Sequence, residues 1–244
     1  MSAPARAAVR VPASTSNLGA GFDCVGVALD RWLDAEASLG AHGDPGPRVE
    51  RAGELARLGA LPAADDLLVR GFAAACAAAG RAVPRGLTLR ARSDVPVARG
   101  LGSSAAALAA GARLADALLG LTLGDRGVAA LCATLEGHPD NAAPACLGGA
   151  VLGVPAPGGA WTLAPLALHP GVAFALAVPD FPASTAAMRR ALPGALPHAD
   201  AVRAAGKAAA LVHGLATADG ALLAWALDDV LHVPYRRALI PAYD

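Results

Sequence analysis

Short runs of alternating or continuous apolar side chains predict the strands of this chain. In residues 87–92, for example, apolar and polar side chains alternate as they do in a strand with one buried face. A bulge is predicted near Asp30, and the glycine- and proline-rich residues 156–160 predict a turn that joins the last two strands. The predicted strands are residues 7–13, 25–37, 87–92, 149–154 and 172–178.

Apolar positions three and four apart predict amphipathic helices between these strands. In the first helix, Leu68, Phe72 and Cys76 form one stripe, and either Asp65 or Asp66 can cap the start. Further helices are predicted at residues 103–119, 125–135, 141–146, 184–192, 200–217 and 221–231. Because strands and helices interleave without strict β-α-β alternation, the predicted fold class is α+β. The densest turn composition, near residue 155, predicts two domains, 1–155 and 156–244.

Composition and charge exclude several classes of protein. The formal net charge is zero, which argues against broad nucleic-acid binding, because that requires a basic face. Residues 141–179 carry no charged side chain, but prolines and glycines interrupt them repeatedly, so no membrane helix is expected. The four cysteines form no C-x-x-C pair, and the N-terminus resembles no secretory signal, so we expect reduced thiols and a cytoplasmic location.

The most informative stretch is residues 96–106, PVARGLGSSAA, which places two glycines and two serines directly before a long Ala/Leu run. Glycines allow a tight turn close to a ligand, and the first turn of a helix offers N–H groups to a phosphate. Ser103 or Ser104 can cap that helix. The stretch is not the common G-x-x-x-x-G-K-[S/T] loop, and Lys207 is the only lysine. Phosphate charge must therefore be met by backbone amides, a metal ion and arginine.

A second polar stretch, residues 136–144 (EGHPDNAAP), contains one of only four glutamates in the chain. Glu136 together with a loop serine could hold Mg²⁺, which prefers hard oxygen ligands and takes few of them from protein. A solvated loop is the simpler alternative. A zinc site is not expected, because the other histidines lack paired spacing and no cysteine is placed to join them.

Taken together, these stretches resemble one enzyme family. Residues 96–106 are similar to the nucleotide-binding loop of the GHMP small-molecule kinase superfamily. Residues 12–23 (PASTSNLGAGFD) and residues 136–144 narrow the resemblance to the homoserine kinases. Ser184-Thr185 followed by Arg189, and Pro234-Tyr235-Arg236 followed by Leu239-Ile240-Pro241, also resemble this family. The similarity covers essentially the whole chain, with the motifs in the family's order.

The resemblance implies a two-domain fold: a ribosomal S5 domain 2-like, ATP-binding domain at 1–155 and a ferredoxin-like C-terminal domain at 156–244. It implies transfer of the ATP γ-phosphoryl group to the hydroxyl of L-homoserine, on the route to threonine, with Mg²⁺ as cofactor. It also implies a cytoplasmic homodimer. The implied nucleotide-binding residues are Pro96, Val97, Ala98, Arg99, Gly100, Leu101, Gly102, Ser103, Ser104, Ala105 and Ala106.

The remaining implied roles agree with the chemistry of a zwitterionic amino acid. Ser104 and Glu136 would hold Mg²⁺, and His138 and Asn141 would orient the acceptor hydroxyl. Asp140 is either a general base or a structural residue that caps the helix at 141–146. The residues that would bind homoserine are Asp23 with Asn17 at the ammonium, and Arg189, Arg236 and Thr185 at the carboxylate.

The chain departs from the family at its C-terminal end. Homoserine kinases carry a third glycine-rich motif, S-G-x-G-P, and none follows residue 155 here. We therefore expect an incomplete C-terminal domain, an exposed sheet edge and apolar face, and a chain that is poorly soluble or weakly active. Two alternatives stay open: another kinase of the superfamily that acts on mevalonate-like or sugar substrates, and a non-catalytic ligand-binding member.

Overall fold

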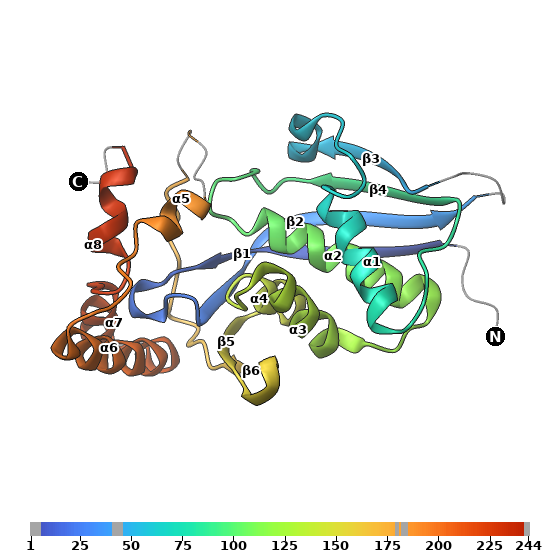
Figure 1. Ribbon diagram of the computed structural model, residues 1–244. Helices are drawn as coiled ribbons and strands as arrows, with labels where there is room; N and C mark the ends of the chain where they lie inside the picture. Colours follow the sequence, from blue (N-terminus) through green and yellow to red (C-terminus); the bar gives the residue numbers. More distant parts are fainter. Residues whose placement is uncertain (1–5, 41–45, 179–180, 182–184, 242–244) are drawn as a thin grey trace.

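The computed structural model describes residues 6–40, 46–178, 181 and 185–241, and it confirms the α+β class (Figure 1). Six strands form one sheet in the order β3-β4-β2-β5-β6, with β1 paired to β2. The pairing is antiparallel except between β3 and β4. The strands are β1 (Arg6–Ser16), β2 (Val25–Leu39), β3 (Arg48–Gly53), β4 (Leu87–Ser93), β5 (Ala150–Pro155) and β6 (Trp161–Leu166).

A bulge divides the long β1–β2 ladder, as the sequence predicts. The register shifts between Pro12 and Ala13 of β1, which leaves Asp30 and Arg31 of β2 without partners in that ladder. Beyond the bulge, β1 continues to Ser16, three residues past its predicted end. Ser14 and Ser16 therefore belong to the sheet and share one of its faces, because side chains two apart in a strand point the same way.

Helices α1 to α4 pack together on one face of the sheet (Figure 1). Asp66 caps α1 by accepting hydrogen bonds from the amides of Leu68 and Val69. The core between these helices and the sheet includes Phe72 and Leu89, both fully buried. The helices are α1 (Leu67–Ala78), α2 (Ser103–Leu119), α3 (Gly124–Glu136), α4 (Ala142–Leu147), α5 (Thr185–Arg190), α6 (His198–Thr217), α7 (Gly220–Leu227) and α8 (Val233–Arg236).

The C-terminal helices α5 to α8 gather at the end of the sheet where β1 finishes (Figure 1). A second, smaller core joins α6 and α7 to the start of β2 through Val25, Leu211 and Ala226. The α6 helix also contacts the 3₁₀ turn Gly19–Gly21, which follows β1. The connection between β1 and β2 and the C-terminal helices therefore pack together in one region of the molecule.

One strand prediction is wrong. Residues 172–178 belong to no strand, and β5 pairs instead with β6. The amide of Ala156 donates to the carbonyl of Ala160 at 2.8 Å, which closes a tight hairpin that pairs the segments on either side of it. The sheet thus continues past residue 155, and the division of the chain at that residue stays a prediction. Ser184, the predicted start of α5, lies outside the described residues.

Within the part of the chain that the structure describes, no helix is both long enough and apolar enough to cross a membrane.

Candidate active site

Most of the predicted site residues line one cavity of about 400 Å³. Four segments meet there: the end of β1 and the turn after it, the loop before α2, the loop between α3 and α4, and the C-terminal helices α5 and α8. The lining residues are Ser16, Asn17, Asp23, Ala98, Gly100, Gly102, Ser103, Ser104, Glu136, His138, Asp140, Asn141, Met188, Arg189 and Arg236.

The start of α2 is arranged to receive an anion. Gly102 is its N-cap residue, with a left-handed backbone (φ 64°), and among the described residues no side chain caps the helix. The prediction that Ser103 or Ser104 caps it is therefore wrong, because both serines lie inside the first turn. Ser103 Oγ accepts from the amide of Ala98 at 3.4 Å, and Ser104 donates to Glu136. The first-turn amides and the positive end of the helix dipole face the cavity.

Gly102 is required by close packing as well as by its backbone angle. A Cβ atom built on it would lie 2.1 Å from Ser14 Oγ and 3.0 Å from Asn141 Oδ1. Any side chain at this position would therefore collide with Ser14 and crowd the side chain of Asn141. The glycine lets three separate segments approach one another at the mouth of α2.

Asn141 is held by two serines of β1. Ser14, which is 0% exposed, donates to Asn141 Oδ1 at 3.0 Å. The side-chain nitrogen of Asn141 donates in turn to Ser16 Oγ at 2.9 Å. These bonds fix the orientation of the amide and link residues more than 120 positions apart in the sequence.

Glu136 is the last residue of α3 and lies beside the start of α2. Its Oε1 accepts from the hydroxyl of Ser104 at 2.8 Å, and its Oε2 is buried without a hydrogen-bond partner. Burial raises the pKa of this carboxyl group above its usual range. A buried carboxylate oxygen without a partner, next to a hydroxyl, fits a hard divalent cation. Among the described residues, no three or more His, Cys, Asp or Glu side chains are grouped so that they could hold a metal ion, so the fit is to a cation such as Mg²⁺ that takes few protein ligands.

His138 and Asp140 form a tight pair in the loop between α3 and α4. His138 Nδ1 lies 2.5 Å from Asp140 Oδ1, and the Asp140 side chain is only 1% exposed. The hydrogen bond to Asp140 is the main cause that raises the pKa of His138, which keeps the ring protonated to a higher pH. Gly26 of β2 makes room for this loop, since a Cβ there would lie 1.6 Å from the Asp140 carbonyl oxygen.

Charged groups on the other side of the cavity are paired with each other. Arg189 of α5 makes two hydrogen bonds to the carboxylate of Asp23, at 2.8 and 2.9 Å. Asp23 and Asn17 both have left-handed backbones (φ 56° and 60°), a conformation that Asp and Asn adopt more readily than most residues. Such strained positions occur often at functional sites.

Arg236 of α8 lies beside this pair and is 9% exposed. Its guanidinium group lies 4.6 Å from the centre of the Phe22 ring, and its Nε donates to the carbonyl of Met188 at 3.1 Å. Burial is the main cause that lowers the pKa of Arg236. The side chain of Thr185 lies outside the described residues.

The eleven predicted loop residues divide into distinct environments. Val97 faces a second hollow of about 310 Å³, whereas Leu101 packs against Ala13 and Val95 in a small core. Pro96 and Arg99 are half-buried, and Ala105 and Ala106 are fully buried inside α2. The residues that line the 400 Å³ cavity are Ala98, Gly100, Gly102, Ser103 and Ser104.

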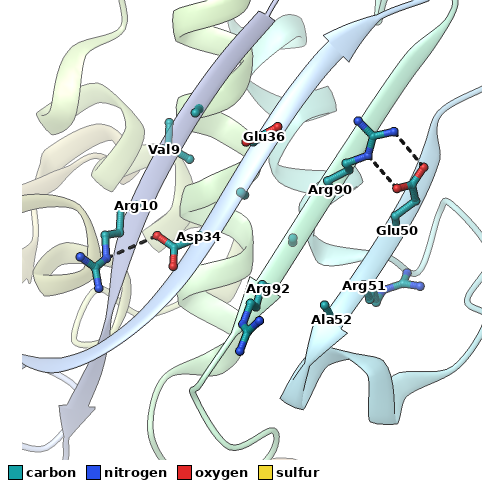
Figure 2. Close-up of a pocket in the computed structure, with 12 residues that line it drawn as sticks. Val9, Arg10, Asp34, Glu36, Glu50, Arg51, Ala52, Arg90 and Arg92 are labelled. Carbon is teal, nitrogen blue, oxygen red and sulfur yellow. Dashed lines mark hydrogen bonds and ion pairs between the residues drawn. The ribbon is translucent and has the colours of Figure 1, made fainter.

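A larger hollow of about 710 Å³ lies on the face of the sheet opposite to helices α1 to α4 (Figure 2). Two ion pairs join charged side chains across neighbouring strands there, as Figure 2 shows for Arg10 with Asp34 and for Arg90 with Glu50. Its lining includes no helix start and none of the buried side-chain atoms that lack a hydrogen-bond partner among the described residues. Size alone therefore does not make it the better candidate, because convergent polar groups distinguish a ligand site.

Sequence reasoning gave no role to two cavity residues, Ser16 and Met188. Ser16 is part of the PASTSN motif, but the sequence pattern predicts that β1 ends at residue 13. The pattern therefore does not show that Ser16 lies on a face of the strand. The backbone carbonyl of Met188 accepts a hydrogen bond from Arg236, and a backbone contact of this kind cannot be predicted from the pattern of side chains.

Comparisons with known proteins identify the family of this chain. Residues 66–149 match the family model for the GHMP kinases N-terminal domain. A homoserine kinase from a Picosynechococcus species is 41% identical over 237 residues, covering 97% of this chain and 77% of the relative. One from Thermus thermophilus is 42% identical over 232 residues, or 95% and 75% of the two chains.

Solved structures show the same likeness. The crystal structure of homoserine kinase from Cytophaga hutchinsonii matches with a TM-score of 0.81 and 26% identity, covering 100% of this chain and 78% of that one. Mevalonate kinase from L. major, at 17% identity and a TM-score of 0.65, shares the fold, with 93% and 76% of the two chains covered. The fold is therefore that of the GHMP kinases, and the chain belongs to the homoserine kinase family.

Proposed function

We propose that this chain transfers the γ-phosphoryl group of ATP to the hydroxyl of L-homoserine, which yields ADP and O-phospho-L-homoserine. The observation that carries the proposal is a single cavity with two complementary ends. One end has the uncapped start of α2 next to Glu136, and the other has Asp23, Arg189 and Arg236. The first end suits a phosphate chain and the second suits an amino-acid zwitterion.

At the phosphate end, the amides from Gly100 to Ser104 would bind the phosphate oxygens. We infer that Ser104 and Glu136 hold Mg²⁺, which when bound would neutralise charge on the β- and γ-phosphate oxygens. The unpartnered Oε2 of Glu136 supports this assignment.

The adenine base would occupy the second hollow of about 310 Å³. This hollow shares Ala98, Ser103 and Ser104 with the larger cavity, so the two meet at the start of α2. Leucine side chains give it the apolar walls that a flat heterocycle requires. The leucines are Leu55, Leu58, Leu61, Leu67 and Leu68.

At the other end, homoserine would exchange partners with an existing ion pair. Its ammonium group would bind Asp23, with Asn17 as a neutral partner, and its carboxylate would bind Arg189 and Arg236. Asp23 and Arg189 already contact each other through two hydrogen bonds, so a zwitterion replaces one charge pair with two. The exchange therefore leaves no charge unpaired in the site, and Thr185 would complete the carboxylate contacts.

The transfer step itself requires positioning more than covalent chemistry. The homoserine oxygen forms a bond to the γ-phosphorus, while the bond from phosphorus to the bridging oxygen breaks and its electron pair stays on ADP. His138 and Asn141 orient the attacking hydroxyl. The carboxylate of Asp140 is 1% exposed and already engaged with His138 Nδ1 at 2.5 Å, so we assign the hydroxyl proton to a phosphoryl oxygen rather than to Asp140.

A coupled assay of ADP release tests the proposal. The purified chain should release ADP with L-homoserine, and far less with mevalonate, because mevalonate has no ammonium group for Asp23. Comparable rates with mevalonate would favour another kinase of the superfamily. Calorimetry with Mg·ATP addresses the non-catalytic alternative, since a chain that binds no nucleotide would contradict kinase activity.

The cellular setting is part of the same proposal. The product lies on the route to threonine, and the four cysteines, all free thiols in the structure, support a cytoplasmic location. The homodimer implied by the resemblance stays a prediction, which light scattering of the purified chain would test.

A further inference from the structure

The hydroxyl group of Ser16 has no part in the roles assigned so far, although it lines the cavity. Ser16 is the last residue of β1, and its pairing with Gly26 of β2 fixes its backbone. Gly26 in turn packs directly against the backbone of Asp140, the residue before Asn141. The end of β1 and the α3–α4 loop therefore hold Ser16 between them on rigid elements.

Two hydrogen bonds determine what this hydroxyl can offer. Ser14 donates to Asn141 Oδ1, so the amide nitrogen of Asn141 points the other way and donates to Ser16 Oγ. A serine hydroxyl that accepts through a lone pair keeps its own O–H for another partner. Among the described residues, no group accepts a hydrogen bond from Ser16 Oγ, and its neighbours in the relay strengthen it as a donor.

The position of Ser16 places this donor between the two ends of the cavity. Ser14, on the same face of β1, lies against Gly102 at the phosphate end. Asn17, the next residue along the chain, lines the cavity together with Asp23 at the homoserine end. The donor therefore lies where the γ-phosphoryl group would meet the homoserine hydroxyl.

We propose that Ser16 donates a hydrogen bond to the phosphoryl group during transfer and is an additional catalytic residue; this inference rests on the function proposed above. A donor on the homoserine oxygen would withdraw the electron pair that attacks phosphorus, whereas a donor on a phosphoryl oxygen stabilises charge there. The chain's only lysine, Lys207, is 1% exposed and donates to the Trp225 carbonyl, so it cannot supply this contact.

Replacement of the hydroxyl tests the proposal. Ser16→Ala should lower kcat by about tenfold to a hundredfold, with little change in KM for homoserine or Mg·ATP, because the bond forms mainly in the transition state. Ser16→Thr keeps the hydroxyl on a strand residue and should recover most of the rate. A merely structural role would instead lower the melting temperature of Ser16→Ala and leave kcat unchanged.

A binding measurement provides a second readout that does not depend on turnover. Mg·ADP with aluminium fluoride and homoserine mimics the phosphoryl group in transfer, and Ser16→Ala should weaken its binding by a factor similar to the loss in kcat. Binding of Mg·ADP alone should not change. An active wild-type chain with an unaffected Ser16→Ala variant would overturn this inference alone. A wild-type chain that neither turns over homoserine nor binds the mimic would overturn the proposed function, and this inference with it.

Discussion

At the scale of single residues, the buried carboxylate of Glu136 destabilises the fold when no ligand is bound to it. One oxygen of its carboxylate is bonded to Ser104, while the other is buried without a partner. Burial of a charge without compensation destabilises a fold, and the raised pKa of Glu136 reflects that cost. Such a carboxylate is explained most simply by a cation that binds there when substrate is present.

Glu136→Gln should therefore change stability and activity in opposite directions. The neutral amide keeps the shape and can still accept from Ser104, so the melting temperature without Mg²⁺ should rise by a few degrees. The rate of ADP release should fall by about a hundredfold or more, because the cation loses its charged ligand. Differential scanning fluorimetry and Mg²⁺ titration of the rate measure the two effects.

Glu50→Gln is the matched control, because Glu50 is an exposed glutamate on the outer face of the sheet. It should leave both the rate and its Mg²⁺ dependence unchanged. A Glu136→Gln variant that loses stability and activity together would indicate a structural residue instead of a cation ligand.

We expect His232 to make the stability of the protein depend on pH. Its ring stacks on Phe22 at a centroid distance of 4.8 Å, and its Nε2 is buried without a hydrogen-bond partner. Burial is the main cause that lowers its pKa; the Arg236 charge lowers it further, whereas Asp229, a backbone hydrogen bond to Gly19 and the Asp23 charge oppose the shift. A histidine with a lowered pKa binds fewer protons when folded than when unfolded, so its contribution to stability falls as pH drops below the unfolded pKa of about 6.5.

His232→Phe keeps an aromatic ring in the stack but cannot bind a proton. The melting temperature of the variant should therefore decrease less than that of the wild type between pH 7.5 and pH 5.5, whatever the difference at neutral pH. Melting curves across this range measure the two slopes. Equal slopes would show that His232 does not contribute to the acid sensitivity.

At the scale of elements, the start of α2 requires a glycine at position 102, because a side chain there would collide with residues that are distant in the sequence. Gly102→Ala places a Cβ atom 2.1 Å from Ser14 Oγ in a left-handed conformation. We expect weaker Mg·ATP binding and a loss in kcat/KM of about a hundredfold, because a shift of about 1 Å in the reacting groups has that effect. Calorimetry and the ADP-release assay measure these losses.

Gly120→Ala at the other end of α2 is the control. Gly120 has nearly the same φ (62°), but a Cβ there meets no atom within 4 Å. It should cost about 1–2 kcal/mol of stability through backbone strain alone and leave Mg·ATP binding intact. If both variants lost binding equally, strain rather than contact with Ser14 would be responsible.

The same element shows what sequence patterns can and cannot predict. Both ends of α2 and the Asp66 cap of α1 follow from local signals, namely glycines, a capping carboxylate and helical periodicity. The prediction of a strand at 172–178 is wrong because a strand needs a neighbour to pair with. The hairpin at 156–160 places β6 beside β5, in the position that residues 172–178 would need. The Ser14–Asn141–Ser16 bonds join distant segments, so no local pattern could reveal them.

At the scale of the whole molecule, the homoserine end of the cavity is shared by two layers. The connection between β1 and β2 supplies Asp23, whereas the C-terminal layer of α5 and α8 supplies Arg189 and Arg236. The segment that leads to α8 is anchored by Lys207 of α6. Its Nζ donates to the carbonyl of Trp225 at 2.9 Å, to the carbonyl of Asp228 and to the Asp228 carboxylate at 2.8 Å. This buried lysine thus fixes the backbone at Trp225 and Asp228, and we expect it to help position Arg236 further along the same segment.

Lys207→Met retains the length of the side chain but removes all three hydrogen bonds. Two carbonyls would lose a partner, at a cost of about 1–3 kcal/mol each, so the melting temperature should fall by several degrees. Because the anchored segment carries Arg236 and not the phosphate loop, KM for homoserine should rise while KM for Mg·ATP changes little. Arg203→Met, on the same helix but 54% exposed, should affect neither constant. An equal rise in both KM values for Lys207→Met would mean that the two layers respond as one unit, and that Lys207 stabilises the whole fold without selectively positioning Arg236.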